Sequence, residues 1–490
     1  MTTDRPEPPW VLPSHDDPVV ASASQLIGGP VGRRAIIGGS WWTPMRVLLV
    51  LVVLASALGV FLDQPCRKTA WSDSTKQYTH ACYTDVVPLF WVRGLADGVV
   101  PYFTDLTGSD VEPVEYPVLT GLAMWATSLP VPDDWSTQGR GRLYFDINAA
   151  VAMVLAMVTV WATALIARRR VWDAAMVAVA PGLILASTVN WDMWAVALTA
   201  LGLLMWSRRY PFGAGLLIGL AVAAKFYPLL LLGPLLLLCL RAGRMRAFWL
   251  TFAGTVVSWS AINLPVMAAN FDGWARFYEL SRERGSDFGS IWFVIDGFGN
   301  NVSAVADVNR HGMEALALLC LCIAGLILMA PRRPRLGQVS FLVVAAFLLT
   351  NKVYSPQYVL WLIPLAVLAR PRWRDFMWWQ TAEVLYFLAV WWYVHGFTNP
   401  DRALPETSYY IAVLVHIVAT AAYAGFVVRD IWSPRHDPVR SSGDDDPAGG
   451  VLDGAVDKRV WGRWARTGQS DERGTDQTSS TAPEDMPTLR

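Results

Sequence analysis

The chain has 490 residues, with 40 basic and 40 acidic side chains and a formal net charge of zero. Hydrophobic residues make up 54% of the sequence and charged residues 16%, whereas an ordinary soluble domain is about 25% charged. The balanced charge argues against a nucleic-acid partner, because such proteins carry a basic surface. Apolar runs of about membrane-spanning length recur between residues 46 and 428, which predicts an all-α polytopic membrane protein.

The two ends of the chain differ in composition from the middle. Residues 1–44 are polar, contain Pro and Gly, and show no cleavable signal pattern before the first apolar run at 45–62. Residues 431–490 are rich in Asp, Ser, Gly, Pro, Arg and Thr and have no apolar periodicity. We expect a disordered cytoplasmic leader over 1–44 and a disordered cytoplasmic tail over 431–490, flanking a membrane domain at 45–430.

A large polar loop, residues 63–143, follows the first predicted span. Its apolar stretch 116–129 is short and ends at Pro130, so we expect a helix that lies in the interface and does not cross. The loop also holds Cys66 and Cys82, the only two of the five cysteines predicted to lie outside the membrane. An oxidising outer face permits a disulfide between them.

Arginine clusters set the predicted topology. They lie at 168–170, 208–209, 241–246, 332–335 and 370–374. If 116–129 does not cross, twelve spans place all five clusters and both termini in the cytoplasm, as the positive-inside rule favours. Some predicted spans are shorter than the roughly 20 residues of a full crossing, so the count is good to one or two spans.

Most of the remaining ionisable residues then gather on the outer face. Two of the five lysines, Lys225 and Lys352, each lie at a helix end beside tyrosine and proline. A charged group at membrane depth is costly unless it faces a partner or a water-filled cavity, which makes both lysines candidates for a site. The alternatives are that the lysines reach toward lipid headgroups, that Asp192 caps a helix, and that Asp85 is a solvated loop carboxylate.

Four short motifs together resemble glycosyltransferase family 87, in the GT-C superfamily. They are YTDVVP at 83–88, EYPV at 115–118, KFYP at 225–228 and KVYSPQY at 352–358. The family includes polyprenol-phosphate-mannose-dependent alpha-1,2-mannosyltransferases of actinobacterial envelopes, and the resemblance covers about residues 45–430. It implies a GT-C fold of about twelve transmembrane helices, with interfacial helices in a large first external loop and an acid shortly after the first span.

The resemblance implies transfer of a sugar, with mannose expected, from a polyprenyl-phosphate donor to a lipid-linked or glycolipid acceptor at the outer face. Such an inverting transfer needs a carboxylate to take the acceptor proton and cations around the departing phosphate. We predict Asp85 as the base and Glu115 as a second catalytic carboxylate, with Asp192 a competing candidate. The predicted substrate-binding residues are Asp192, Lys225, Tyr227, Arg284, Lys352, Tyr354, Gln357, Tyr358 and His395.

No cofactor is expected, and no G-x-G-x-x-G nucleotide motif follows a predicted strand. Asp85, Glu115 and Asp192 have the ligand chemistry for a metal, but lysines already offer positive charge, so we expect none. Membrane lipid is a further partner, and a multi-pass protein of the cell membrane with its active site outside is the expected localisation.

Two other classes share some of these features. A secondary transporter also has about twelve spans, but it should show internal repeats and a site at the membrane midplane. The sequence has no repeat at half its length, and its polar clusters lie at one face. A lipid-linked glycan polymerase or ligase would also have large external loops.

Overall fold

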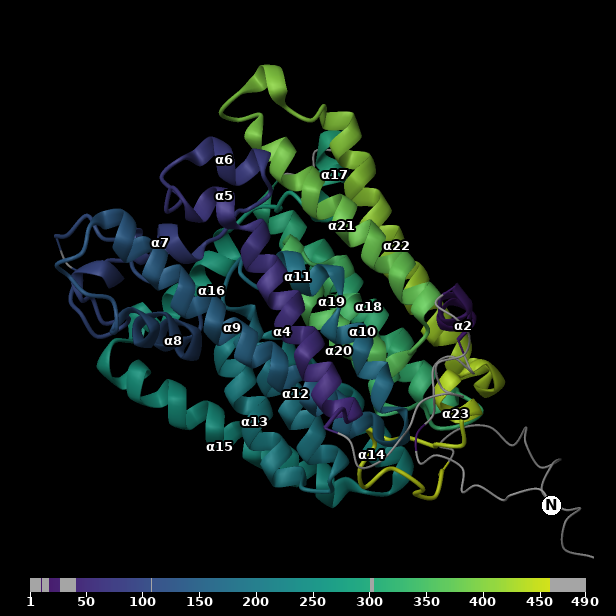
Figure 1. The fold of residues 1–490 in the computed structure, drawn as a ribbon. Helices are drawn as coiled ribbons and strands as arrows, with labels where there is room; N and C mark the ends of the chain where they lie inside the picture. The colour runs from purple at the N-terminus through teal and green to yellow at the C-terminus, as the bar shows by residue number, and fades with distance from the viewer. Residues whose placement is uncertain (1–9, 11–16, 27–40, 107, 300–303, 459–490) are drawn as a thin grey trace, which may run out of the picture.

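The computed structural model describes residues 10, 17–26, 41–106, 108–299 and 304–458 (Figure 1). Within these ranges all regular secondary structure is helical, which confirms the predicted all-α class for this part of the chain. The longest helices are α4 (Pro44–Leu62), α9 (Thr137–Ala167), α15 (Met245–Ala269), α18 (Val305–Met329), α21 (Trp373–His395) and α22 (Glu406–Trp432).

Shorter apolar helices fill the space between the long ones. They are α8 (Val118–Ser128), α10 (Ala175–Ala178), α11 (Pro181–Ala186), α12 (Asp192–Ser207), α13 (Pro211–Ala224), α14 (Leu232–Ala242), α19 (Leu336–Thr350) and α20 (Val359–Ala369). Five stretches of the described chain are long and apolar enough to cross a membrane: those at 44–62, 137–178, 245–269, 305–329 and 406–432. These segments support a membrane protein, while the count of twelve spans stays a prediction.

Small residues let neighbouring helices approach closely. Gly215 of α13 faces the backbone of α15, where an added Cβ would lie 2.1 Å from the carbonyl oxygen of Thr251. Gly254 of α15 is as tightly placed, with the carbonyl oxygen of Phe212 2.4 Å from its ideal Cβ position. Such small-residue contacts are typical of helix pairs in membranes, where close backbone approach replaces the hydrophobic driving force.

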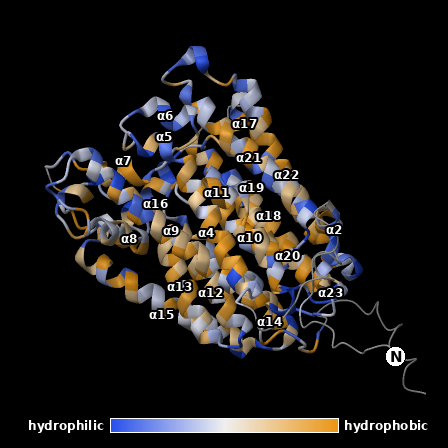
Figure 2. Cartoon of the chain, in the orientation of Figure 1, coloured by the Kyte–Doolittle hydropathy of each residue, from blue (hydrophilic) through white to orange (hydrophobic). Residues whose placement is uncertain are grey.

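Short helices and loop segments lie at the two ends of the bundle. At the upper and left side of Figure 1 lie α5 (Gln64–Arg67), α6 (Ser74–Thr79), α7 (Val86–Val92), α8, α16 (Phe271–Glu283) and α17 (Ile291–Gly297). Toward the lower right lie α2 (Pro18–Leu26) and α23 (Pro438–Ser441). Figure 2 shows apolar residues along the helices between them and hydrophilic residues concentrated at these ends, as expected for a chain that spans an apolar layer.

Within the described residues, six short 3-10 helices connect or interrupt the α-helices. They are η1 (Leu95–Asp97), η2 (Arg168–Ala174), η3 (Tyr227–Leu231), η4 (Pro356–Tyr358), η5 (Pro400–Arg402) and η6 (Pro434–His436). η3 and η4 both begin at or directly before a proline, two residues after Lys225 and four residues after Lys352. The two conspicuous lysines therefore lie in irregular segments between helices, where backbone groups and side chains are free to face a cavity.

The loop at 63–143, predicted to be external, is folded onto the bundle. Helix α8 has 11 residues, so it is about 16 Å long, roughly half the thickness of the hydrocarbon core. The hydroxyl of Thr120 in α8 donates to the carbonyl of Ala224 at the end of α13 (2.6 Å). The short length of α8 and its contact with the end of α13 agree with the prediction that this stretch does not cross the membrane.

The predicted pairing of Cys66 with Cys82 is present as a disulfide, with the two Cα atoms 6.0 Å apart. Both cysteines are buried. The indole N–H of Trp71 donates to the carbonyl of Cys82 (2.8 Å), and the Trp71 ring packs on Phe145 of α9. The cross-link therefore fixes the segment that leads directly into Tyr83 against a long helix.

The prediction of a disordered tail from residue 431 onward is wrong for residues 431–458. Asp437 and Leu452 are fully buried, and the indole N–H of Trp206 in α12 donates to the carbonyl of Gly449 (2.7 Å). The polar, Gly-rich composition suggested disorder, but the acids of this segment pair with arginines at helix ends. The part of the predicted tail at 459–490, and most of the predicted leader, lie outside the described residues.

Those arginines also satisfy backbone carbonyls at helix C-termini. Arg335 donates to the carbonyl of Leu368 near the end of α20 (2.7 Å) and forms an ion pair with Asp437 (2.7 Å). Arg241 donates to backbone carbonyls at the end of α18 and forms an ion pair with Asp457 (2.6 Å). Cations at helix C-termini complement the unpaired carbonyls and the helix dipole, so the arginine clusters have a structural role besides any role in topology.

We expect the two ends of the bundle to lie on opposite sides of the membrane. In a variant with Cys320 and Cys322 replaced by Ser, Asp134→Cys in the first loop should react with an impermeant thiol reagent added to intact cells. Val456→Cys, which is 74% exposed, should react only after lysis. The reverse labelling pattern would place the proposed site in the cytoplasm and contradict the account.

Candidate active site

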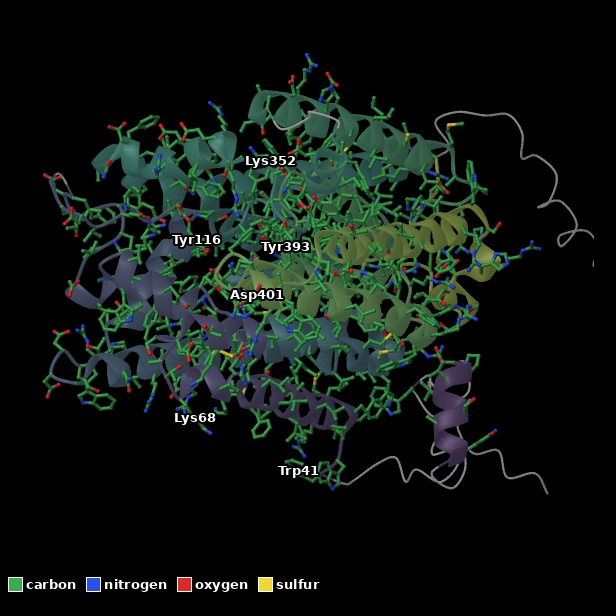
Figure 3. The ribbon with its side chains drawn as sticks, turned by 90° about the horizontal axis from the view of Figure 1, so that it is seen from above. Trp41, Lys68, Tyr116, Lys352, Tyr393 and Asp401 are labelled. Atoms are coloured by element: carbon green, nitrogen blue, oxygen red, sulfur yellow. A yellow bond between two sulfur atoms is a disulfide. The ribbon has the colours of Figure 1, made fainter. Side chains whose placement is uncertain are left out.

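A cavity of about 890 Å³ opens among the first loop, the segment after α16, and the segments that follow α13 and α19. Its volume lies in the range typical of ligand sites, about 300–1,000 Å³. Figure 3 shows the molecule from above and labels two residues of the cavity wall, Tyr116 and Lys352. The predicted site residues in the wall are Asp85, Glu115, Lys225, Tyr227, Arg284, Lys352, Gln357 and Tyr358.

Asp85 lies directly before α7 and is fixed on both its backbone and its side chain. Its N–H donates to the carbonyl of Val189 (2.8 Å), and the hydroxyl of Thr84 donates to the carbonyl of Thr188 (2.6 Å). The hydroxyl of Tyr83 donates to Oδ1 of Asp85 at 2.6 Å. The turn between α11 and α12 thus holds Asp85 in the cavity wall, and the alternative of a freely solvated loop carboxylate does not describe it.

Burial raises the pKa of the Asp85 carboxyl above its ordinary value, and this is the largest effect on it. Hydrogen bonds from Tyr83 and Asn190 and the positive charge of Lys225 oppose the increase, while the negative charge of Asp192 adds to it. A general base works best when its pKa lies near the working pH, so a raised pKa suits Asp85 to accept a proton.

Glu115 is held by an arginine that the sequence analysis did not single out. Arg93, directly after α7, is buried. Its Nη2 lies 3.3 Å from Oε2 of Glu115, and its Nη1 lies 2.5 Å from Oε2 of Glu112. The Glu115 side chain remains 34% exposed. The ion pair fixes Glu115 at the cavity wall with part of its carboxylate accessible.

Asp192 was predicted to bind substrate. It is fully buried and does not line the cavity. Its Oδ1 accepts a hydrogen bond from the indole N–H of Trp361 (2.8 Å) and lies 3.2 Å from Nζ of Lys225. Its observed contacts are those of a counter-ion for Lys225. Within the described residues, no three His, Cys, Asp or Glu side chains are grouped so as to hold a metal ion.

Lys225 directly follows α13, and its side chain lies near two aromatic rings. Its Nζ lies 5.2 Å from the ring centroid of Tyr116 and 5.8 Å from that of Tyr358. A cation within about 6 Å of an aromatic face is stabilised by it. The lysine is therefore held at the cavity wall by Asp192 on one side and two rings on the other.

A second cationic region surrounds Lys352. Its Nζ donates to the carbonyl of Arg282 (3.1 Å). Burial lowers the pKa of the Lys352 amine, and the positive charge of Arg284 lowers it further. Arg284 lies 3.6 Å from Asp287, and the hydroxyl of Ser355 donates to Asp287 at 2.7 Å. Two basic side chains therefore stand close together in the wall, with Asp287 offsetting only part of their charge.

Besides Asp192, two predicted substrate-binding residues lie outside the cavity wall. Tyr354 is buried, with its hydroxyl 3.3 Å from that of Thr420. His395 is buried at the end of α21, with its ring centroid 6.4 Å from that of Tyr78. Tyr227 does line the cavity but is almost fully buried, and its ring stacks on Trp361 at 4.6 Å. From these positions, Tyr354 and His395 support the residues that line the cavity.

Part of the cavity wall is apolar. It is formed by α16, α18 and α19, with Phe277, Tyr278, Leu280, Val308, Met313, Leu316 and Phe347. Helix α18 is little buried within the protein, so this side lies at the periphery of the bundle. One cavity therefore joins a polar region, with acids and bases, to an apolar region next to the predicted lipid.

Residues 117–351 match the sequence model of glycosyltransferase family 87. The chain carries a glycosyltransferase family 87 domain. The match contains the Asp192–Lys225 pair and Arg284, and it begins two residues after Glu115 and ends one residue before Lys352. No curated protein matches the chain.

The family 87 domain makes the protein a membrane glycosyltransferase, as the four motifs indicated. Sequence reasoning missed Arg93, Asp287, Tyr83 and Asn190, which hold or flank the predicted residues in the wall. Tyr83 is inside the YTDVVP motif and Asn190 precedes Trp191 and Asp192, so their position beside candidate residues was the available signal. Nothing in the sequence paired Arg93 with Glu115.

We expect Tyr83→Phe to move the acidic limb of the pH profile to higher pH. The Tyr83 hydroxyl lowers the pKa of Asp85, and its removal should raise that pKa further. If Asp85 must be ionised for transfer, activity is lost as the pH falls through this pKa. The measurement is kcat/KM against pH, with Tyr78→Phe as the control. A limb that stays in place or moves to lower pH would exclude Asp85 as the titrating group.

Proposed function

We propose that this glycosyltransferase moves a sugar, with mannose expected, from a polyprenyl-phosphate donor to a lipid-linked or glycolipid acceptor at the outer membrane face. The observation that carries the proposal is the composition of this cavity. It combines a partly buried carboxylate, Asp85, with the basic residues Lys225, Arg284 and Lys352 and an apolar wall at the bundle periphery. The family 87 domain supports sugar transfer as the reaction.

The basic residues suit a phosphate leaving group. As the bond between C1 of the sugar and the phosphate oxygen breaks, negative charge grows on the phosphate, and fixed cations stabilise that charge. Lys225 is already paired with Asp192. Arg284 lies 3.6 Å from Asp287, and the charge of Glu115 also acts on it, while the Lys352 amine donates to a neutral backbone carbonyl, so this pair of cations has positive charge left for a phosphate.

The apolar wall suits a lipid chain. A polyprenyl donor has a phosphate head and a long hydrocarbon tail, so its site must join a cationic pocket to a hydrophobic surface. The cavity wall contains both kinds of side chain: the basic Arg282 and Lys352, and the apolar Leu316 and Phe347. A nucleotide-sugar donor would need neither the apolar wall nor its position next to lipid.

Asp85 acts as the base of a single displacement in this proposal. The acceptor hydroxyl gives its proton to the Asp85 carboxylate as its oxygen bonds to C1, and the phosphate departs with the electron pair of the broken bond. Tyr83 orients the carboxylate through Oδ1. Glu115 is held by Arg93 and partly exposed, so we assign it to bind sugar hydroxyls.

The buried disulfide supports a site on the outer side of the cell membrane. Disulfides persist in oxidising compartments and are rare in the cytosol, and Cys82 is joined to Asp85 by only two intervening residues. A multi-pass protein with both termini cytoplasmic and this cavity facing outward is the arrangement that we propose.

We expect Asp85→Asn to lower kcat by about 10²–10⁴-fold, the usual contribution of a general base. The amide keeps the size of the side chain but accepts no proton, so donor affinity should change little. The measurement is single-turnover transfer together with donor binding. Glu115→Gln is the matched control and should cost less. Should Asp85→Asn keep more than about a tenth of the rate while Glu115→Gln loses nearly all, Glu115 is the base.

A further inference from the structure

Two ionisable side chains lie buried between α21 and α22, outside the cavity wall. Glu383 is 3% exposed and His416 is fully buried. Nδ1 of His416 lies 3.5 Å from Oε2 of Glu383. Ionisable residues inside a membrane helix bundle are costly and therefore rare, and they are candidates for a functional role by default. Neither residue was singled out from the sequence.

Glu383 is held by three neighbours. Its Oε1 accepts hydrogen bonds from the indole N–H of Trp379 (3.1 Å) and the hydroxyl of Thr420 (3.1 Å), and its Oε2 faces His416. The two hydrogen bonds to Oε1 fix the orientation of this buried carboxylate. Glu383 therefore provides a fixed acceptor for the imidazole.

The second ring nitrogen of His416 reaches out of the helix pair to a loop. Its Nε2 lies 3.3 Å from the carbonyl oxygen of Gly289. The ring is stacked on Tyr386, with centroids 4.0 Å apart and planes 8° apart, and it contacts Tyr354 at 4.5 Å. Both ring nitrogens thus face oxygen acceptors, one on Glu383 and one on the loop.

That loop is tied to the segment that carries Lys352. The N–H of Asp287 donates to the carbonyl of Lys352 (2.8 Å), and the hydroxyl of Ser355 donates to the Asp287 carboxylate (2.7 Å). Asp287, Lys352 and Ser355 all line the cavity. A displacement of residues 287–289 would therefore be transmitted to Lys352.

Two tyrosines of the same helices anchor these segments as well. The hydroxyl of Tyr386 in α21 donates to the carbonyl of Tyr354 (3.1 Å), and that of Tyr409 in α22 donates to the carbonyl of Phe288 (2.9 Å). The contact is close: an added Cβ at Gly289 would lie 1.9 Å from the Tyr386 hydroxyl. The loop is seated against α21 and α22 with no space for a larger residue.

We propose that Glu383 and His416 are a positioning pair for the donor phosphate. They fix the carbonyl of Gly289 and, through Asp287, the position of Lys352. The proposal rests on the proposed function, which assigns Lys352 to the phosphate. Because neither member of the pair lines the cavity, they act on donor binding only through the loops, and the acceptor side of the cavity near Glu115 should not depend on them.

The test is the variant His416→Phe combined with Glu383→Gln. Phe keeps a ring between Tyr354 and Tyr386 but has no N–H groups, and Gln avoids an unpaired buried carboxylate. We expect the donor KM to rise about tenfold, the effect of losing one buried hydrogen bond to the Gly289 carbonyl. The acceptor KM should stay within about twofold, which a general loss of structure would not allow.

Two further variants separate positioning from stability. Tyr423→Phe removes a buried hydroxyl of α22 that donates to the carbonyl of Arg370 (2.7 Å), away from the cavity. It should lower the unfolding temperature without changing the donor KM. The single variant His416→Gln keeps an amide N–H for the carbonyl of Gly289 and should largely restore the donor KM. If the double variant does not fold, His416→Gln and Glu383→Gln are compared directly.

Hydrogen exchange distinguishes failure of this proposal from failure of the proposed function. Amides 287–290 should exchange faster in the double variant and not in Tyr423→Phe, whatever the donor is. Lys352→Met should raise the donor KM; an unchanged KM would refute its assignment to the phosphate. The positioning pair is refuted if exchange of 287–290 is unchanged, or if the double variant alters donor and acceptor KM equally.

Discussion

A charge buried in an apolar helix bundle must have a partner, because its desolvation is otherwise too costly. This constraint explains why the two ends of the bundle differ. At one end, Arg241 and Arg335 are each matched by an aspartate of residues 433–458 and by helix carbonyls. At the other end, Lys352 and Arg284 face a cavity, where Asp287 lies 3.6 Å from Arg284 and the Lys352 amine donates to a backbone carbonyl. The incomplete pairing identifies the end at which a negatively charged ligand would bind.

The same constraint separates three carboxylates that look equivalent in the sequence. Asp192 forms an ion pair with Lys225, and Glu115 forms an ion pair with Arg93. Asp85 is held instead by the neutral groups of Tyr83 and by Asn190. Burial raises the pKa of Asp85, and its hydrogen-bond partners offset only part of that increase, so the carboxylate remains able to take up a proton. The roles proposed for these acids follow from their partners and not from their order in the chain.

The sequence predicted what depends on composition and local pattern. Apolar runs predicted the helical class, and the scarcity of lysine drew attention to Lys225 and Lys352, which both line the cavity. Cysteine placement predicted the Cys66–Cys82 pair. These predictions succeeded because each rests on a property of a short segment.

What failed depends on partners far apart in the chain. Residues 431–458 look disordered in isolation, because their acids are stabilised only by arginines such as Arg335. His395 and Tyr354 were expected in the site, but the rotation of a helix or turn decides whether a side chain faces the cavity. The pair of Glu383 and His416 gave no signal, since each is a lone ionisable residue in an apolar run.

The central claim, that a lipid phosphate carries the sugar, is tested most directly by supplying the donors to purified protein. The protein is mixed with a membrane lipid extract as acceptor and with mannose carried either on polyprenyl phosphate or on a nucleotide. The account predicts a new glycolipid from the polyprenyl-phosphate donor alone, and loss of that product in Asp85→Asn. Transfer from the nucleotide donor, or none from the polyprenyl-phosphate forms of mannose, glucose and arabinose, would contradict it.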